Sequence, residues 1–192
     1  DLDEEKKDVL FFVDNVFRFL QAGSELSTLT GEIPSEFGYQ PTLQSEIAAF
    51  ENRLYSTEDA YVTSVQTVYV PADEFGNPAV SATMPHMDAV VILSRDLTYE
   101  GHYPAVDPFR SMSLALNPKL VGVEHYQTAT EAVEVLNNYK QLARIVSIVG
   151  EEELSIENQK RYQRAKKIIN YMTQSFITTE VETGRAGVTV AR

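Results

Sequence analysis

An unbroken apolar run near the start of the chain, Val9–Val13, constrains the fold most, and Asp14 and Asn15 follow it directly. Unbroken runs are typical of strands buried on both faces of a parallel sheet, because strands with one wet face alternate apolar and polar residues. Two further runs, 63–70 and 88–93, also read as strands. The first part of the chain is therefore predicted to contain a buried parallel sheet.

Helical spacing separates the first two predicted strands. Residues 40–55 carry apolar side chains three to four residues apart, at Leu43, Ile47, Phe50 and Leu54. Strands that alternate with helices form right-handed crossovers and a parallel sheet. The fold class predicted for this part is therefore α/β.

The second part of the chain has the pattern of a helical domain. Apolar residues recur at helical spacing over 124–149, and Gly150 is expected to end that helix. Ser155 is expected to cap a second helix that runs to about Met172. The balance of charge also differs between the two parts. Residues 1–106 hold 5 basic and 18 acidic residues, whereas residues 107–192 hold the remaining 11 basic and 10 acidic residues.

Composition excludes several classes of function. The chain has no cysteine, so disulfide scaffolds and thiol nucleophiles are excluded. Its net charge of −12 argues against general nucleic-acid binding, which needs a basic surface. No apolar stretch is long enough to span a bilayer. The charged residues 1–8 do not form a signal peptide, so we expect a chain that is not secreted.

Asp14 and Arg18 are the first candidates for chemistry. A carboxylate at the end of a buried strand can place Mg²⁺ beside phosphates, although most such residues are ordinary strand ends. Arg18 could reach an anion, or it could be a surface arginine. None of the nine glycines precedes a lysine, so this segment cannot carry a complete phosphate-binding P-loop.

Other residue types give weaker signals. Three aromatic residues near predicted loops could line an adenine pocket, although core packing is the commoner role: Tyr69, Tyr103 and Phe176. The histidines match no metal-ligand spacing, and each is expected at the surface or in a hydrogen bond: His86, His102 and His125. The acidic run 151–153 is most simply a solvated loop.

Several long stretches carry a resemblance to a known family: 9–25, 33–43, 63–73, 103–108, 121–126 and 180–184. They resemble the catalytic β subunit of F-type ATP synthase, more than the non-catalytic α subunit or the vacuolar-type and flagellar-export relatives. The resemblance implies the second half of a RecA-like P-loop NTPase domain with parallel strands, at 1–120. An α-helical bundle would follow at 121–192. The P-loop would lie upstream, and the segment alone would be inactive.

The resemblance also implies roles near the nucleotide, with Mg²⁺ and ATP or ADP as cofactors. Asp14 would hold Mg²⁺ through water, and Asn15 and Arg18 would act in catalysis near the γ-phosphate. The implied nucleotide-binding residues are Tyr69, Tyr103, Phe176 and Thr179.

The implied partners are an α-like subunit that alternates with this one in a hexameric ring, and a central γ-like shaft. The implied shaft contacts are Asp73, Glu152, Glu153, Leu154, Ser155 and Glu157. Acidic loops of this kind would face a basic shaft. We expect no nucleic-acid partner and membrane attachment only through other subunits. The location would be peripheral to a membrane, on the cytoplasmic, mitochondrial matrix or chloroplast stroma side.

Some positions depart from the family pattern. Glu182 replaces an adenine-pocket phenylalanine. Ile156 and Asn158 replace acidic residues in the loop that carries the implied shaft contacts Glu152 to Glu157. A carboxylate disfavours an apolar purine slot unless it turns to solvent. The departures favour a divergent β-like paralogue. They leave open an alternative, a catalytically degenerate subunit with a structural or force-transmitting role.

Overall fold

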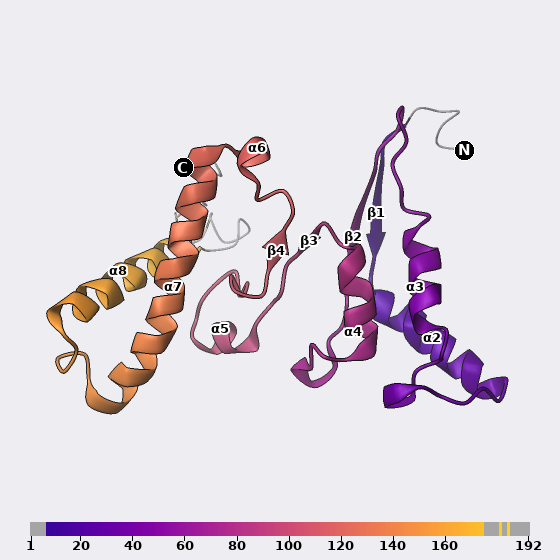
Figure 1. Ribbon diagram of the computed structural model, residues 1–192, viewed down its shortest axis with the longest axis horizontal. Helices are drawn as coiled ribbons and strands as arrows, with labels where there is room; N and C mark the ends of the chain where they lie inside the picture. The colour runs from indigo at the N-terminus through magenta and orange to yellow at the C-terminus, as the bar shows by residue number, and fades with distance from the viewer. Residues whose placement is uncertain (1–6, 175–180, 182–183, 185–192) are drawn as a thin grey trace. The chain divides into compact units, whose positions relative to one another are not determined.

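The computed structural model describes residues 7–174, 181 and 184, and the side chain of Glu36 is outside that description. The chain divides into two compact units, Asp1–Met87 and Asp88–Arg192, and each is described by itself (Figure 1). The sequence-based boundary between residues 120 and 121 stays a prediction.

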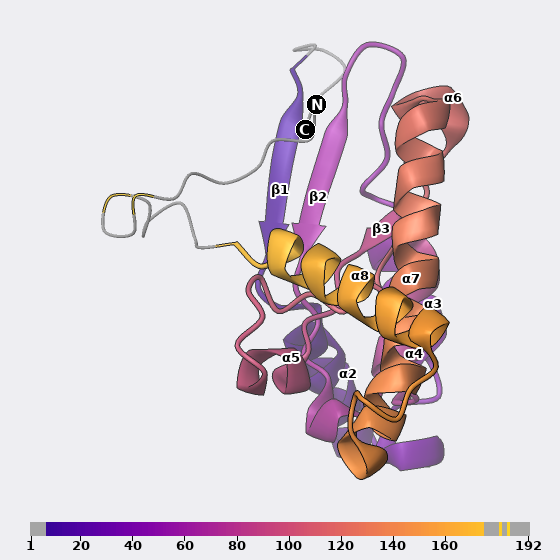
Figure 2. The same ribbon diagram turned by 90° about the vertical axis from the view of Figure 1, so that its left-hand side faces the viewer.

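The first unit is an α/β structure built on two parallel strands. β1 (Val9–Val13) pairs with β2 (Val62–Gln66) in a register that joins Val9 to Val62 and Val13 to Gln66 (Figure 2). The helices of the unit are α2 (Val16–Leu29), η1 (Glu36–Gly38), α3 (Leu43–Glu51), η2 (Pro71–Asp73), α4 (Pro78–Thr83) and η3 (Met84–His86). The parallel pairing and the helix predicted within 40–55 are confirmed, with the helix shorter than predicted.

The apolar core of the first unit lies among α2, α3 and α4. Its buried members are Val16, Phe17, Leu20, Tyr39, Leu43, Ile47 and Ala79. Two buried polar side chains are built into it. The Tyr39 hydroxyl donates to Asn77 Oδ1 at 3.0 Å, and the Gln40 amide donates to the Leu20 carbonyl at 3.3 Å. The first bond joins the segment before α3 to the N-cap of α4, and the second joins the same segment to α2.

The sequence pattern predicted that β1 is buried on both faces. Within the part of the chain that the structure describes, this prediction is wrong. Leu10 is 59% exposed and Phe12 is 66% exposed, whereas Val13 packs against the core. The reason is that β1 belongs to a two-stranded sheet here, and the helical core lies against one face of it. An unbroken apolar run therefore coexists with one open face.

The second unit begins with an irregular region and ends in helices. Its elements are β3 (Ala89–Val90), α5 (Arg95–Tyr99), β4 (Met112–Ser113), α6 (Pro118–Val121), α7 (Val123–Val149) and α8 (Ile156–Met172). The run 88–93 was predicted to be a strand of the parallel sheet. It forms instead the short β3, which pairs antiparallel with β4. Beyond the end of β3, the Ile92 N–H donates to the Ser111 hydroxyl at 2.9 Å.

α7 and α8 form a helical hairpin, as predicted (Figure 1). α7 is followed by its C-cap residue Gly150, whose φ of 92° lies in the left-handed region that favours glycine. The Ser155 hydroxyl caps α8 by accepting from the Asn158 N–H at 3.4 Å. The Tyr139 and Tyr162 rings stack 5.0 Å apart between the helices. Among the residues that the structure describes, no helix has the length and apolar character needed to cross a membrane.

Candidate functional site

Asp14 lies at the carboxyl end of β1, beside the end of β2. The Thr67 hydroxyl donates to Asp14 Oδ1 at 2.8 Å, and the Thr67 N–H donates to the Val13 carbonyl at 2.9 Å. The peptide bond between Asp14 and Asn15 is cis. The carboxylate is exposed and is anchored by the neighbouring strand. Ligands of open parallel sheets bind at this end of the strands.

Thr67 is a site residue that the sequence analysis missed. The register places Val13 opposite Gln66, so the residues that follow each strand, Asp14 and Thr67, lie side by side. A parallel pairing assigned in that register would have predicted the contact, but the sequence pattern alone does not fix a register.

Asn15 and Arg18 occupy the start of α2. Asn15 Oδ1 accepts from the Arg18 N–H at 3.1 Å and so caps the helix. The Arg18 guanidinium is exposed and donates to Gln21 Oε1 at 3.0 Å. A guanidinium has five N–H donors, so this one bond is compatible with binding an anion as well. The cap therefore places a cationic side chain in the first turn after Asp14.

The Tyr69 side chain contacts the core through Phe17 and is partly exposed to solvent. Its ring meets Phe17 edge-on, with centroids 5.6 Å apart and planes at 67°, and Phe17 belongs to the buried core. The side chain of Tyr69 is still 53% exposed. The structure thus brings four predicted site residues to one region of the first unit: Asp14, Asn15, Arg18 and Tyr69.

The donor set at Asp14 fits a magnesium ion that arrives with phosphates. Mg²⁺ in nucleotide sites binds one or two carboxylates, waters and substrate oxygens. Asp14 supplies one carboxylate, with one oxygen bonded to Thr67. Among the described residues, no group of three or more His, Cys, Asp or Glu side chains could hold a metal by itself. Asp14 is an exposed carboxylate that could contact such an ion directly or through water.

The remaining predicted nucleotide-binding residues belong to the second unit. Tyr103 is 39% exposed, and its carbonyl accepts from the Gln174 N–H at 2.6 Å. Its peptide bond to Pro104 is cis. Phe176 and Thr179 lie outside the described residues. Their roles stay predictions.

The loop between α7 and α8, which carries predicted shaft contacts, is held against α8 by side-chain hydrogen bonds and an ion pair. Glu151 accepts from the Gln163 amide and pairs with Lys166 at 3.3 Å, and these contacts hold the pKa of Glu151 below its usual value. The Gln159 amide donates to the carbonyls of Glu152 and Leu154. The acidic run is therefore an ordered loop.

Within this loop the predicted contact residues differ in exposure. Leu154 is 8% exposed and packs with Leu142 and Tyr162, so its side chain anchors the loop. The side chains open to solvent are those of Glu152, Glu153, Ser155 and Glu157. Glu157 pairs with Arg161 at 2.6 Å. The exposed carboxylates are thus the part of the loop able to meet a partner.

Asp73, the other predicted shaft residue, is exposed at the end of η2. Ala72 and Asp73 have φ values of 51° and 58°, in the left-handed region that non-glycine residues seldom adopt. Such strain is often found at functional loops. The structure therefore presents Asp73 on a turn of unusual conformation.

Comparison with known families covers nearly the whole chain. Residues 1–113 match the family described as "ATP synthase alpha/beta family, nucleotide-binding domain". Residues 115–187 match the family described as "C-terminal domain of V and A type ATP synthase". The two matches support a nucleotide-binding part followed by a helical domain.

Two solved structures share the fold. One is the unique ATP synthase subunit NeqB from Nanoarcheaum equitans, at TM-score 0.80 and 24% identity over 94% of this chain and 47% of that one. The other is the assembled ATPase EscN from the type III secretion system of enteropathogenic E. coli, at TM-score 0.75 and 24% identity, over 87% of this chain and 40% of that one. The chain thus spans less than half the length of either.

Proposed function

We propose, from the premise that this chain belongs to the ATP synthase alpha/beta family, that it is part of the catalytic β-like subunit of a rotary F-type ATP synthase or ATPase. Its reaction would be the synthesis or hydrolysis of ATP, coupled to rotation of a shaft. The observation that carries the proposal is the arrangement of Asp14, Thr67 and Arg18 at the carboxyl end of the parallel strands.

Each residue of that arrangement has a chemical task. Asp14, oriented by the Thr67 hydroxyl, would hold the magnesium of the nucleotide, directly or through water. Bound Mg²⁺ would supply charge neutralisation at the phosphate oxygens. Asn15 fixes the first turn of α2, and Arg18 on that turn would stabilise the charge of the transferring phosphoryl group.

The nucleoside would be bound by aromatic side chains. Tyr69 offers a ring supported by Phe17, and Tyr103 would lie against the adenine. The sequence contains no G-x-x-x-x-G-K-[ST] motif, so the phosphate cradle would have to come from another segment of the protein. Turnover would therefore need more than these 192 residues.

The proposal includes the assembly. An α-like subunit would alternate with this one in a ring, and a γ-like shaft would contact Asp73, Glu152, Glu153 and Glu157. The exposure of these four carboxylates supports contact with a basic partner. The assembly would lie peripheral to a membrane and attach through other subunits.

A V- or A-type rotary subunit is the second candidate. It is favoured by the match of residues 115–187 to the C-terminal domain of V and A type ATP synthase. Purification of the native complex, with identification of its subunits by mass spectrometry, separates the two. F-type partner subunits support the first candidate, and V- or A-type partners support the second.

The catalytic assignment is tested by MgATP turnover of the assembled complex. Asp14→Asn and Arg18→Ala are each expected to lower kcat about 100-fold or more, because each removes a charge that would stabilise the transferring group. Asp88→Asn and Arg53→Ala are matched controls at exposed positions and should leave kcat unchanged. Wild-type kcat in both site variants would overturn the assignment. A native complex that binds nucleotide at this subunit without turning it over would identify a degenerate subunit.

A further inference from the structure

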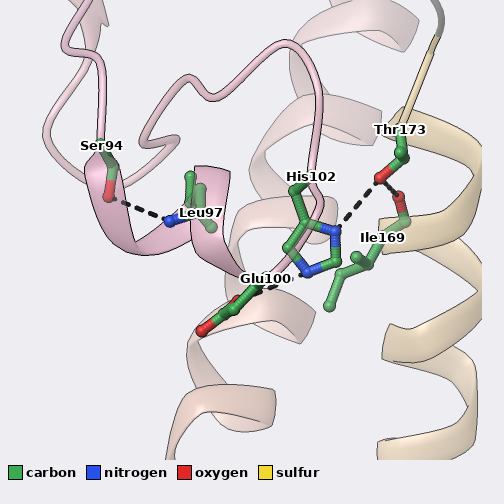
Figure 3. Close-up of polar contacts among 6 residues, drawn as sticks. All are labelled: Ser94, Leu97, Glu100, His102, Ile169 and Thr173. Atoms are coloured by element: carbon green, nitrogen blue, oxygen red, sulfur yellow. Dashed lines mark hydrogen bonds and ion pairs between the residues drawn. The ribbon is translucent and has the colours of Figure 1, made fainter.

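The loop that carries Tyr103 is ordered by bonds of its own. At its base the Ser94 N–H donates to the Ala105 carbonyl at 2.8 Å. The Ser94 hydroxyl caps α5 by accepting from the Leu97 N–H at 3.4 Å, and the His102 N–H donates to the Leu97 carbonyl at 2.8 Å (Figure 3). The main chain is therefore held up to the residue before Tyr103.

The end of α8 is attached to this loop at two successive residues. The Gln174 N–H donates to the Tyr103 carbonyl at 2.6 Å. One residue earlier, Oγ1 of Thr173 lies 3.3 Å from Nδ1 of His102, a residue 71 positions away in the sequence (Figure 3). Thr173 is the C-cap residue of α8, and both its N–H and its hydroxyl donate to the Ile169 carbonyl. The last turn of α8 and the Tyr103 loop are thus joined side by side.

The Thr173 hydroxyl stands between helix and loop. Its single hydrogen is used in the bond to the Ile169 carbonyl at 2.9 Å, so its oxygen accepts from His102. A hydrogen on Nδ1 is enough for this bond, and the neutral imidazole in that tautomer supplies it. Glu100 Oε2 lies 3.4 Å from the other ring nitrogen, but that ion pair needs a protonated ring, so the attachment of the loop does not depend on it.

Both attachments fix the main chain around Tyr103 and leave its ring out. One uses the Tyr103 carbonyl, and the other uses the side chain of the preceding residue. Tyr103 is 39% exposed, so part of its surface is open to a ligand. A main chain that is fixed before binding restricts the positions of the ring, and this lowers the entropy cost of packing the ring against a planar base.

We propose that Thr173 is a positioning residue for Tyr103: its hydroxyl fastens the loop to the end of α8 and so holds the Tyr103 ring in place for an adenine base. The inference rests on the proposed function, because it takes Tyr103 to be a nucleotide contact. Loss of the hydroxyl should weaken the binding of the base and leave the handling of the phosphates unchanged.

Kinetics of the assembled complex provide the first test. Thr173→Val keeps the shape of the side chain and removes the hydroxyl, so the KM for MgATP should rise about threefold to tenfold, the equivalent of one modest hydrogen bond. The kcat should change little, because Thr173 touches no reacting phosphate in the proposal. Thr173→Ser keeps the hydroxyl and should keep the wild-type KM. An unchanged KM in Thr173→Val overturns the proposal.

Thr30→Val is the matched control. Thr30 is the C-cap residue of α2, and its hydroxyl donates to the Leu26 carbonyl at 3.1 Å, four residues earlier, as the Thr173 hydroxyl does to Ile169. This variant removes the same kind of helix-end bond and should leave the KM for MgATP unchanged. An equal rise in KM in Thr30→Val and Thr173→Val would show a general effect of losing such a bond, and it would overturn the proposal.

Magnesium tripolyphosphate separates the positioning of Tyr103 from a general defect, because it has the phosphates of ATP without a base. As a competitive inhibitor of the assembled complex, it should have the same Ki in the wild type and in Thr173→Val. A Ki that rises as much as the KM for MgATP overturns the proposal.

Tyr103→Ala distinguishes this proposal from the proposed function. In the Tyr103→Ala background, Thr173→Val should raise the KM for MgATP no further, since the hydroxyl acts through the ring. If Tyr103→Ala raises the KM and Thr173→Val does not, positioning by Thr173 is wrong and the proposed function stands. If Tyr103→Ala leaves the KM unchanged, Tyr103 is not a nucleotide contact, and the proposal fails together with that assignment.

Hydrogen exchange of the Gln174 amide, followed by NMR of the whole chain, tests the attachment without nucleotide. Exchange should be faster in Thr173→Val than in the wild type, because the neighbouring bond that holds the loop is lost. Thr173→Ser should exchange at the wild-type rate. Equal protection of the Gln174 amide in all three proteins would show that the hydroxyl does not fasten the loop, and it would overturn the proposal.

Discussion

Gly23, in the middle of α2, is the most informative position for a stability test. Helix propensity alone predicts that Gly23→Ala stabilises the chain by about 1 kcal/mol. Packing predicts the opposite, because an added Cβ would fall within 3.0 Å of both Gln40 Nε2 and Glu46 Oε2. The sign of the measured change shows which effect is larger.

The magnitude follows from the bonds that would have to move. Gln40 is 1% exposed, and its amide donates to the Leu20 carbonyl at 3.3 Å and to Glu46 at 2.9 Å. Displacing this buried amide leaves polar groups unpaired, at a cost of about 1–3 kcal/mol for each group. With the two bonds of the Gln40 amide lost, the cost is about 2–6 kcal/mol, and after subtraction of about 1 kcal/mol of helix propensity Gly23→Ala should destabilise the chain by about 1–5 kcal/mol.

Urea unfolding of the chain, followed by circular dichroism and tyrosine fluorescence, measures the change, since the chain has no tryptophan. Hydrogen exchange of the α2 amides reports the loss within the first unit separately. Gly76→Ala is the matched control: its Cβ would meet no atom within 4 Å, and it should be neutral or stabilising by up to about 1 kcal/mol. A Gly23→Ala chain as stable as the wild type, or more stable, would refute this account of the packing.

Three further predictions concern stability. Tyr39→Phe removes the hydroxyl that donates to Asn77 and should cost about 1 kcal/mol in urea unfolding; no change would show that the bond contributes nothing. Leu154→Ala should cost about 2–3 kcal/mol, and the exposed Ile156→Ala less than about 1 kcal/mol, so equal losses would contradict the burial of Leu154. Because the folded chain lowers the pKa of Glu151, its contribution to stability is present at neutral pH and is lost as pH falls through that pKa. The difference in unfolding free energy between wild type and Glu151→Gln should therefore shrink on acidification, and a difference independent of pH would disprove the linkage.

Local signals made the helical hairpin predictable. Gly150 and Ser155 act through their own backbone and side-chain geometry, so the ends of α7 and α8 could be read from neighbouring residues. The parallel pairing of β1 and β2 was also predictable, because an α/β pattern admits few connections.

Features that depend on distant residues were not predictable. The contact between Thr67 and Asp14 needs the register of two strands that are about fifty residues apart. The antiparallel pairing of β3 needs Met112 and Ser113 of β4, which lie more than twenty residues further along the chain. Leu154 directly follows the acidic run 151–153, and the sequence pattern did not predict that its side chain would join the helical core. In the candidate site, the sequence suggested charged and aromatic residues whose roles stay predictions, and the structure added the bonds of Asp14 and Asn15 and the ring contact of Tyr69.

The central claim is that the carboxyl ends of β1 and β2 bind the magnesium and phosphates of a nucleotide. A structure of the assembled complex with Mg²⁺ and a non-hydrolysable ATP analogue tests it most directly. The account predicts a metal ion about 4 Å from an Asp14 carboxylate oxygen if one water intervenes, or about 2 Å if coordination is direct, with Arg18 directed at the terminal phosphate. A nucleotide bound to this subunit with neither Asp14 nor Arg18 near its metal or phosphates would contradict the claim.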